Sequence, residues 1–171
     1  DPERIGITGI SGGGTQSSYI AAFDDRIYAA APENYITSFT RLLQSIGPQD
    51  AEQNMLHAIV RGLDHADLLE VRAPKPALMI TTTRDFFSIQ GSRETAAEIS
   101  RIYKAYGKAG NFNMVEDDTT HAFSKKNCEA IYAFFQKHLR NPGNPADLDI
   151  PPLPKEELYA TSTGQLATSL K

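Results

Sequence analysis

Ser11 stands in a setting that suits nucleophilic chemistry. It is the centre of Gly9-Ile10-Ser11-Gly12-Gly13, a G-x-S-x-G pattern. A serine hydroxyl attacks a carbonyl carbon only when a nearby base takes its proton and a third group orients that base. Alone, the pattern also fits a serine in a tight turn or a phosphate-binding loop. It raises acyl transfer as a hypothesis, and the presence or absence of partner residues decides it.

An acid and a histidine follow Ser11 in the required order. Asp85 comes just after the strand-like segment "ALMITTT", and His121 comes just after "NFNMVE". Parallel strands in an open α/β sheet gather functional groups at their carboxyl ends. The order serine, acid, histidine is that of the nucleophile-elbow hydrolases. We therefore predict that His121 is the base and that Asp85 orients it.

Two other carboxylates compete for the role of the acid. Asp117 and Asp118 lie too close to His121 in sequence to come from the preceding strand, and a solvated turn explains them better. Asp85 itself has a simpler interpretation, because aspartates in loops often cap turns. Its place after an apolar run favours the catalytic interpretation.

The chain has only four histidines, which limits the choice of base. His57 and His138 fall within expected helices, where a solvent or core-edge role is more usual. His65, in "GLDHADLL", suits a local hydrogen-bonding or capping role. His121 could be an ordinary surface histidine, but its place after a late strand fits the base best.

The glycines around Ser11 predict a local geometry. Gly9 and Gly13, two residues before and after the serine, leave room for a strand that turns sharply into a helix. Such a turn strains the serine backbone and makes its hydroxyl project. The first N–H groups of a helix have no partner within it, so Gly12 N–H is expected to donate to a developing oxyanion.

Strands and helices alternate around these residues. We expect strands in "RIGITGI" (4–10), "RIYAAAPE" (26–33, closed by Pro32), "KPALMITTT" (75–83) and "NFNMVE" (111–116), and helices up to Phe23, in "RETAAEISRIYKAYG" (93–107) and in "NCEAIYAFFQKHL" (127–139). This order predicts an α/β fold with a mainly parallel sheet and right-handed crossovers.

Residues 33–75 interrupt this alternation and are predicted to be a lid-like insert. Within it, "QDAEQNMLHAIVRGL" places apolar residues at helical spacing, with Asp50 as the expected cap. Tyr35 and Phe39 could line an acyl or sugar pocket, or they could pack a small core of the insert itself.

Composition excludes several classes of function. The chain has 171 residues, 40% of them hydrophobic and 22% charged, with a net charge of −4. That charge offers no basic surface for nucleic acid, and no apolar run reaches the roughly 20 residues of a membrane helix. The single Cys128 excludes an internal disulfide. No metal-ligand pattern appears, and "GISGGGT" lacks the P-loop lysine, so we expect neither a metal nor another cofactor.

Three segments together resemble the C-terminal part of an α/β-hydrolase domain. They are "RIGITGISGGGTQS", "RAPKPALMITTTRDFF" and "DDTTHAFSKKNCEAIYAFFQKHL". The "APKP" lead-in resembles acetyl-xylan-esterase-like and prolyl-oligopeptidase-type bacterial hydrolases. The resemblance implies a partial α/β-hydrolase fold containing its last four strands, with Ser11, Asp85 and His121 as the triad. It also implies serine-dependent ester hydrolysis, most plausibly deacetylation of a carbohydrate, in an exported protein.

The same resemblance divides the chain into two parts. Residues 1–140 correspond to the end of the hydrolase domain, and residues 141–171 form a linker and tail with five of the ten prolines. The family's earlier strands and its second oxyanion-hole donor are expected before residue 1, so this piece alone is expected to be a poor enzyme. We expect those strands, or a second copy, to cover one open edge of the sheet.

Two alternatives remain open. One is a serine peptidase of the prolyl-oligopeptidase type, and the other is a hydrolase-like module that binds without catalysis. The intact order of Ser11, Asp85 and His121 argues against the second, since a decayed site usually loses one member.

Overall fold

Four parallel strands form the centre of the molecule. The structure is a computed structural model, and it describes residues 1–47 and 49–170. The strands are β1 (Ile5–Ile10), β2 (Ile27–Glu33), β3 (Ala77–Thr82) and β4 (Phe112–Asp117). They pair in sequence order, each parallel to the next. The predicted α/β fold with a parallel sheet is therefore confirmed.

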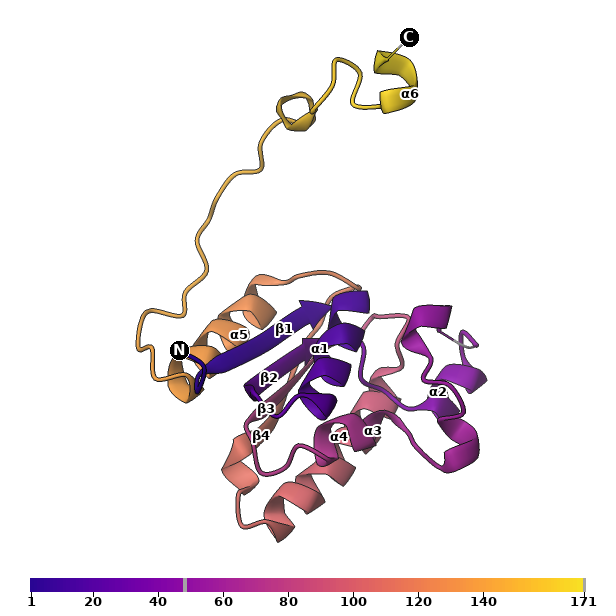
Figure 1. The fold of residues 1–171 in the computed structure, drawn as a ribbon, viewed down its shortest axis with the longest axis vertical. Coiled ribbons are helices and arrows are strands. Elements are labelled where there is room, and N and C mark those ends of the chain that lie inside the picture. Colours follow the sequence, from indigo (N-terminus) through magenta and orange to yellow (C-terminus); the bar gives the residue numbers. More distant parts are fainter. Residues whose placement is uncertain (48, 171) are drawn as a thin grey trace.

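Helices cover both faces of this sheet and make three layers (Figure 1). One face carries α1 (Gly12–Phe23), α3 (His65–Glu70) and α4 (Ile89–Ala105), and the other carries α5 (Lys125–His138). The shorter elements are α2 (Phe39–Gln44), α6 (Leu166–Ser169) and the 3₁₀ turns η1 (Ala51–Gln53), η2 (Ile59–Arg61), η3 (Ala109–Asn111) and η4 (Lys155–Leu158).

Strand β3 shows how the sheet builds a core on each face. Met79 packs with Ile99 in the cluster beneath α3 and α4. Its neighbour Ile80 packs with Ile131 in the cluster beneath α5. Successive side chains of a strand point to opposite faces, and a parallel strand buried on both faces is apolar throughout. This explains the unbroken apolar run that marks β3 in the sequence.

The predicted helix in the insert is wrong. "QDAEQNMLHAIVRGL" forms only η1 and η2, and Asp50 makes no side-chain cap hydrogen bond. His57 (φ 63°) and Gly62 (φ 74°) adopt left-handed backbone conformations, which break a right-handed helix. Val60, expected on a buried stripe, is 87% exposed. The regular elements of the insert are instead α2 and α3.

The chain after α5 leaves the sheet and its helices. In Figure 1 it extends away from them, and its regular elements are η4 and α6. Nearly all its described side chains are exposed. Within residues 1–47 and 49–170, no helix is both long and apolar enough to cross a membrane.

Candidate active site

Ser11 occupies a strained turn between β1 and α1. Its backbone has φ 58° and ψ −118°, which is unusual for a residue with a side chain. Two hydrogen bonds hold it there: Ser11 N donates to Glu33 O (3.0 Å), and Thr15 N donates to Ser11 O (2.9 Å). Strain of this kind persists only where the surroundings enforce it, and it clusters at functional sites.

Two of the surrounding glycines are required by close backbone approach. A Cβ on Gly9 would lie 2.6 Å from the carbonyl carbon of Gly13, and one on Gly14 would collide with the Glu33 carbonyl oxygen. A Cβ on Gly13 or on Gly12 would meet no atom within 4 Å. The sequence pattern singled out Gly9 and Gly13, but it overlooked Gly14.

The turn gives a stability prediction. Gly9→Ala is expected to lower the free energy of unfolding by about 1–3 kcal/mol, because its new methyl group overpacks against backbone that cannot move aside. Gly13→Ala is the matched control, and it is expected to be neutral or slightly stabilising, since alanine is the better helix former. Urea denaturation of both variants measures the difference. Equal losses in the two variants would contradict the close approach at Gly9.

Asp85 and His121 form a partly buried pair. His121 Nδ1 lies 2.8 Å and 3.0 Å from the two carboxylate oxygens of Asp85. The Asp85 side chain is only 2% exposed, and it also accepts hydrogen bonds from Thr82 Oγ1 (2.9 Å) and Phe87 N (3.1 Å). The carboxylate therefore has a fixed orientation. With Nδ1–H donating to it, Nε2 carries the lone pair that a general base needs.

Two aromatic rings flank this histidine. The ring of Phe86 lies 4.4 Å from the imidazole of His121, and that of Phe87 lies 5.9 Å away, centroid to centroid. These rings restrict the orientation of the imidazole and shield part of it from water. Hydrogen bonds and charges are stronger where water is excluded.

Ser11 is not bonded to this pair. In the described part of the chain, neither Ser11 Oγ nor His121 Nε2 has a hydrogen-bond partner. Bonds between nucleophile and base are often long in enzymes without substrate. The two residues lie in loops at the same edge of the sheet, because β1 and β4 are parallel and each is followed by one of these loops. The geometry thus pairs Asp85 with His121, while the Ser11 hydroxyl lies unbonded at the same carboxyl end of the sheet.

Gly12 begins α1 next to the serine. The first turn of this 12-residue helix carries no acidic side chain. Its leading N–H groups lack partners within the helix, and the positive end of the helix dipole lies there. An oxygen that gains negative charge beside Ser11 would be stabilised by both effects.

Glu33 is a buried acid that the sequence analysis missed. It ends β2 and is 0% exposed. Asn127 Nδ2 donates to its Oε1 (3.1 Å), while Oε2 has no partner among the described residues. Burial raises the pKa of Glu33, although the hydrogen bond from Asn127 and the nearby His121 act in the opposite direction. The sequence did carry a signal for this residue, because Glu33 is an acid at the carboxyl end of the strand beside the one that leads to Ser11.

The buried carboxyl predicts a pH-dependent stability. Because its folded-state pKa is raised above the ordinary 4.5, the folded state binds the proton more tightly than the unfolded state does. The penalty is absent below pH 4.5 and grows as the pH rises through the folded-state pKa. Glu33→Gln is therefore expected to be more stable than the native protein at pH 8 and equally stable at pH 4. Urea denaturation at both pH values measures this gain, with Glu157→Gln on exposed η4 as the control. An equal gain at both pH values would contradict it.

His65 has a structural role. Its Nδ1 accepts a hydrogen bond from Thr37 N (3.0 Å), and its ring stacks on Tyr35 with centroids 4.8 Å apart. Burial lowers its pKa to about 4, so it is neutral at physiological pH. The local hydrogen-bonding role expected from the sequence agrees with this geometry, and Asp64 caps α3 directly before it.

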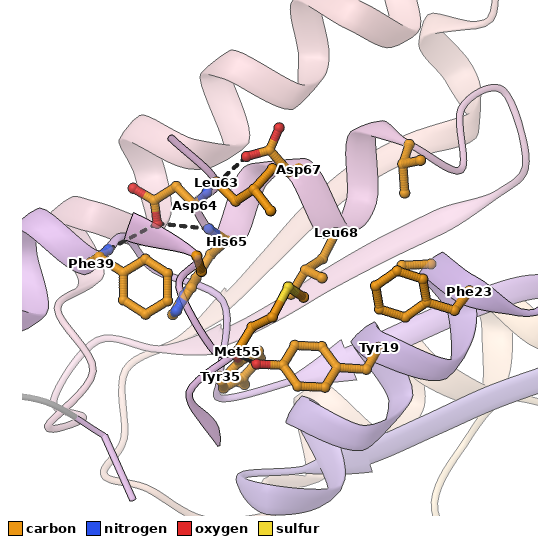
Figure 2. Close-up of a pocket in the computed structure, with 13 residues that line it drawn as sticks. Tyr19, Phe23, Tyr35, Phe39, Met55, Leu63, Asp64, His65, Asp67 and Leu68 are labelled. Carbon is orange, nitrogen blue, oxygen red and sulfur yellow. Dashed lines mark hydrogen bonds between the residues drawn. The ribbon is translucent and has the colours of Figure 1, made fainter. Parts of the chain in front are cut away.

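An apolar cavity lies between α1 and α3 (Figure 2). It measures about 140 Å³, and Tyr19, Tyr35, Met55 and Leu68 are among its walls. Tyr35 also belongs to the core and is 1% exposed. Sugar hydroxyls need polar partners when buried, so this cavity suits an apolar group and not a sugar ring.

Comparison with known proteins gives matches in structure. No family model and no curated protein sequence matches the chain. A solved methylesterase, BT1017, aligns with a TM-score of 0.69 and 26% identity over 86% of this chain and 32% of its own. A family 15 carbohydrate esterase from Caldicellulosiruptor kristjansonii, a glucuronoyl esterase, aligns with a TM-score of 0.64 and 16% identity over 90% of this chain and 48% of its own. The acylaminoacyl peptidase of Pyrococcus horikoshii aligns with a TM-score of 0.59 and 20% identity over 84% of this chain and 25% of its own.

These matches identify the fold. The chain spans between 25% and 48% of the lengths of these three solved structures. Each of the three alignments includes at least 84% of this chain. The described residues contain no cluster of three or more His, Cys, Asp or Glu side chains that could hold a metal ion.

From the three structural alignments, the chain has the fold of one part of an α/β-hydrolase domain, which it shares with these esterases and this peptidase.

Proposed function

We propose that this chain supplies the catalytic serine, histidine and aspartate of a carboxylic ester hydrolase. One observation carries the proposal: His121 Nδ1 is paired with the buried carboxylate of Asp85, at the sheet edge where Ser11 stands in a strained turn. This pairing holds Nδ1 and leaves Nε2 available to act as a base toward Ser11. No other described histidine has such a carboxylate partner.

The proposed reaction is acyl transfer in two steps. Ser11 Oγ attacks the ester carbonyl while His121 Nε2 takes its proton, and the same imidazole then protonates the departing alcohol. Asp85 stabilises the imidazolium that forms between these events. Water then attacks the acyl-serine carbonyl while His121 Nε2 takes its proton. Ser11 Oγ regains a proton from the imidazole as it leaves, and the carboxylic acid is released. Gly12 N–H donates one hydrogen bond to the oxyanion, and losing one such donor typically costs about 10²–10³ in rate.

Esters of carbohydrates are the proposed substrates. The names of the similar structures favour them: one is a methylesterase, and several are glucuronoyl esterases. One of these was solved with methyl 4-O-methyl-β-D-glucopyranuronate, a methyl ester of a sugar acid. The sequence resemblance favours sugar acetates instead. The two differ in which side of the ester bond the sugar occupies, and both fit the proposed chemistry.

A peptidase is the second candidate. Similarity to an acylaminoacyl peptidase favours it, and attack on an amide uses the same three side chains. An amine is a poorer leaving group than an alcohol, so amide hydrolysis depends more strongly on proton donation by His121.

We also propose that the complete catalytic domain includes chain or subunit beyond these residues. Strand β1 pairs only with β2 in the described structure, so its other edge is open. Exposed edges of this kind are normally covered. Residues 1–140 would be one part of that domain, with residues 33–75 as a lid-like insert and residues 141–171 as a linker and tail. Earlier strands of the domain, or a second copy of this chain, would cover β1.

Parallel assays test the proposal. The whole protein is offered a methyl glucuronate ester, acetylated xylan, 4-nitrophenyl acetate and a proline-containing peptide amide. Hydrolysis of esters without cleavage of the amide supports the esterase, and the reverse supports the peptidase. A protein that hydrolyses none of them and does not react with a fluorophosphonate probe would be a non-catalytic module.

A further inference from the structure

The loops that carry the proposed acid and base are fastened to each other. Thr83 N donates to Asp117 O (2.9 Å), and Arg84 N donates to Thr119 O (3.0 Å). These two backbone hydrogen bonds join the loop after β3 to the loop after β4. Together with the bond between the acid and the base, they make the two loops one unit.

The nucleophile belongs to a different unit. Ser11 is bonded through its backbone to Glu33 at the end of β2. Ser11 is therefore positioned through β1 and β2, whereas His121 is positioned through the loops after β3 and β4. The distance between Ser11 and His121 therefore depends on the contacts that join these two units at the carboxyl ends of the strands.

The backbone joins them through the pairing of β2 with β3 and the bond from Asn34 N to Ile80 O (2.9 Å), and two buried side-chain amides add to that connection. Asn127, in the first turn of α5, donates from Nδ2 to Glu33 Oε1 (3.1 Å) and to Thr81 O (3.5 Å). Asn34, just beyond β2, donates from Nδ2 to Ala122 O (3.5 Å), the carbonyl that follows the proposed base. Both amides run from β2 to the segment around His121.

The two amides are costly groups to bury. Asn127 is 0% exposed and Asn34 is 2% exposed. The Oδ1 atom of each has no hydrogen-bond partner among the described residues. An unpaired buried acceptor lowers stability, and an apolar replacement of the same shape can be neutral or better. Asn34 also holds a left-handed backbone with φ 49°. Stability alone therefore does not account for these two residues.

We infer that Asn127 and Asn34 are positioning residues, which set the distance between Ser11 and the Asp85–His121 pair. The inference rests on the proposed hydrolase function. Neither amide touches the reacting atoms. Each instead fastens the end of β2, which holds the nucleophile, to the chain just after the base. A misplacement of about 1 Å at reacting groups can cost about 10²-fold in rate, so loosening this connection should lower kcat without weakening substrate binding.

Two variants test the connection in the whole protein. Asn127→Leu keeps the approximate shape of the side chain and removes its donor without adding a charge beside Glu33. Asn34→Gly removes the second amide and suits the left-handed backbone, since glycine adopts positive φ without strain. Each is expected to lower kcat about 10²-fold with KM unchanged, and to slow fluorophosphonate labelling of Ser11 to the same extent.

Tyr103→Phe is the matched control. Its hydroxyl is buried and donates to Lys75 O (2.8 Å), just before the start of β3 and therefore at the end of the sheet away from the proposed site. Losing this bond should lower stability and leave kcat unchanged. Rates are corrected for the folded fraction of each variant, so that a purely structural effect disappears.

The outcomes separate the two proposals. If Ser11→Ala is inactive while both asparagine variants retain the native kcat, the positioning role is wrong and the hydrolase function stands. If their losses vanish after correction for folding, the amides are only structural, and the inference is again overturned. If Ser11→Ala keeps its activity, the proposed function itself fails. Should Asn127→Leu not fold, Asn34→Gly alone decides.

Discussion

Replacing Ser11 with alanine is expected to lower kcat for ester hydrolysis by about 10⁴- to 10⁶-fold, the scale seen when a serine hydrolase loses its nucleophile. In the proposed mechanism, this hydroxyl forms the acyl intermediate. Labelling by a fluorophosphonate probe should be lost to the same degree. Steady-state assays on the preferred ester, together with a labelling gel, measure both effects.

The strained backbone at Ser11 sharpens this test. Alanine keeps the side-chain penalty of φ 58°, whereas glycine adopts positive φ freely. Ser11→Gly is therefore expected to be as inactive as Ser11→Ala and yet more stable, by up to about 1–3 kcal/mol. Ser100→Ala is the control, because that hydroxyl only donates to Ala96 O within α4. Native activity in Ser11→Ala would show that the turn is structural.

Much of this architecture was readable from local patterns. Ala77 to Ile80 of β3 form a continuous apolar run, and α1 ends at Phe23 as expected, although it already begins at Gly12 within the glycines. The order Ser11, Asp85, His121 then placed three residues at the carboxyl ends of parallel strands. Parallel pairing made that placement strong, because it sends every such loop to one edge.

Other features depend on contacts between distant residues and could not be read in this way. The apolar spacing in residues 49–63 suggested a helix, but left-handed backbone at His57 and Gly62 breaks it. The contact between Glu33 and Asn127 joins residues 94 positions apart. Neither residue type nor local spacing reveals such a pair before the fold is known.

Asp85→Asn is expected to lower kcat by about 10⁴-fold while the fold is retained. The carboxylate now accepts from His121 Nδ1, Thr82 Oγ1 and Phe87 N. An amide of the same shape accepts through one oxygen only, and its NH₂ group would donate to Nδ1. The proton would then reside on Nε2, where the base needs a lone pair. KM should change little, because this side chain is buried behind the histidine and does not face solvent.

Asp118→Asn provides the matched control for the acid. Asp118 lies in the same region, accepts from Thr83 Oγ1 (2.6 Å) and is exposed, but it makes no bond to His121. Its loss should leave kcat within about twofold of the native value, since exposed pairs contribute little. A large loss in Asp118→Asn with native activity in Asp85→Asn would reverse the assignment of the acid. The pair of variants therefore separates a carboxylate that orients the base from one that only stabilises its loop.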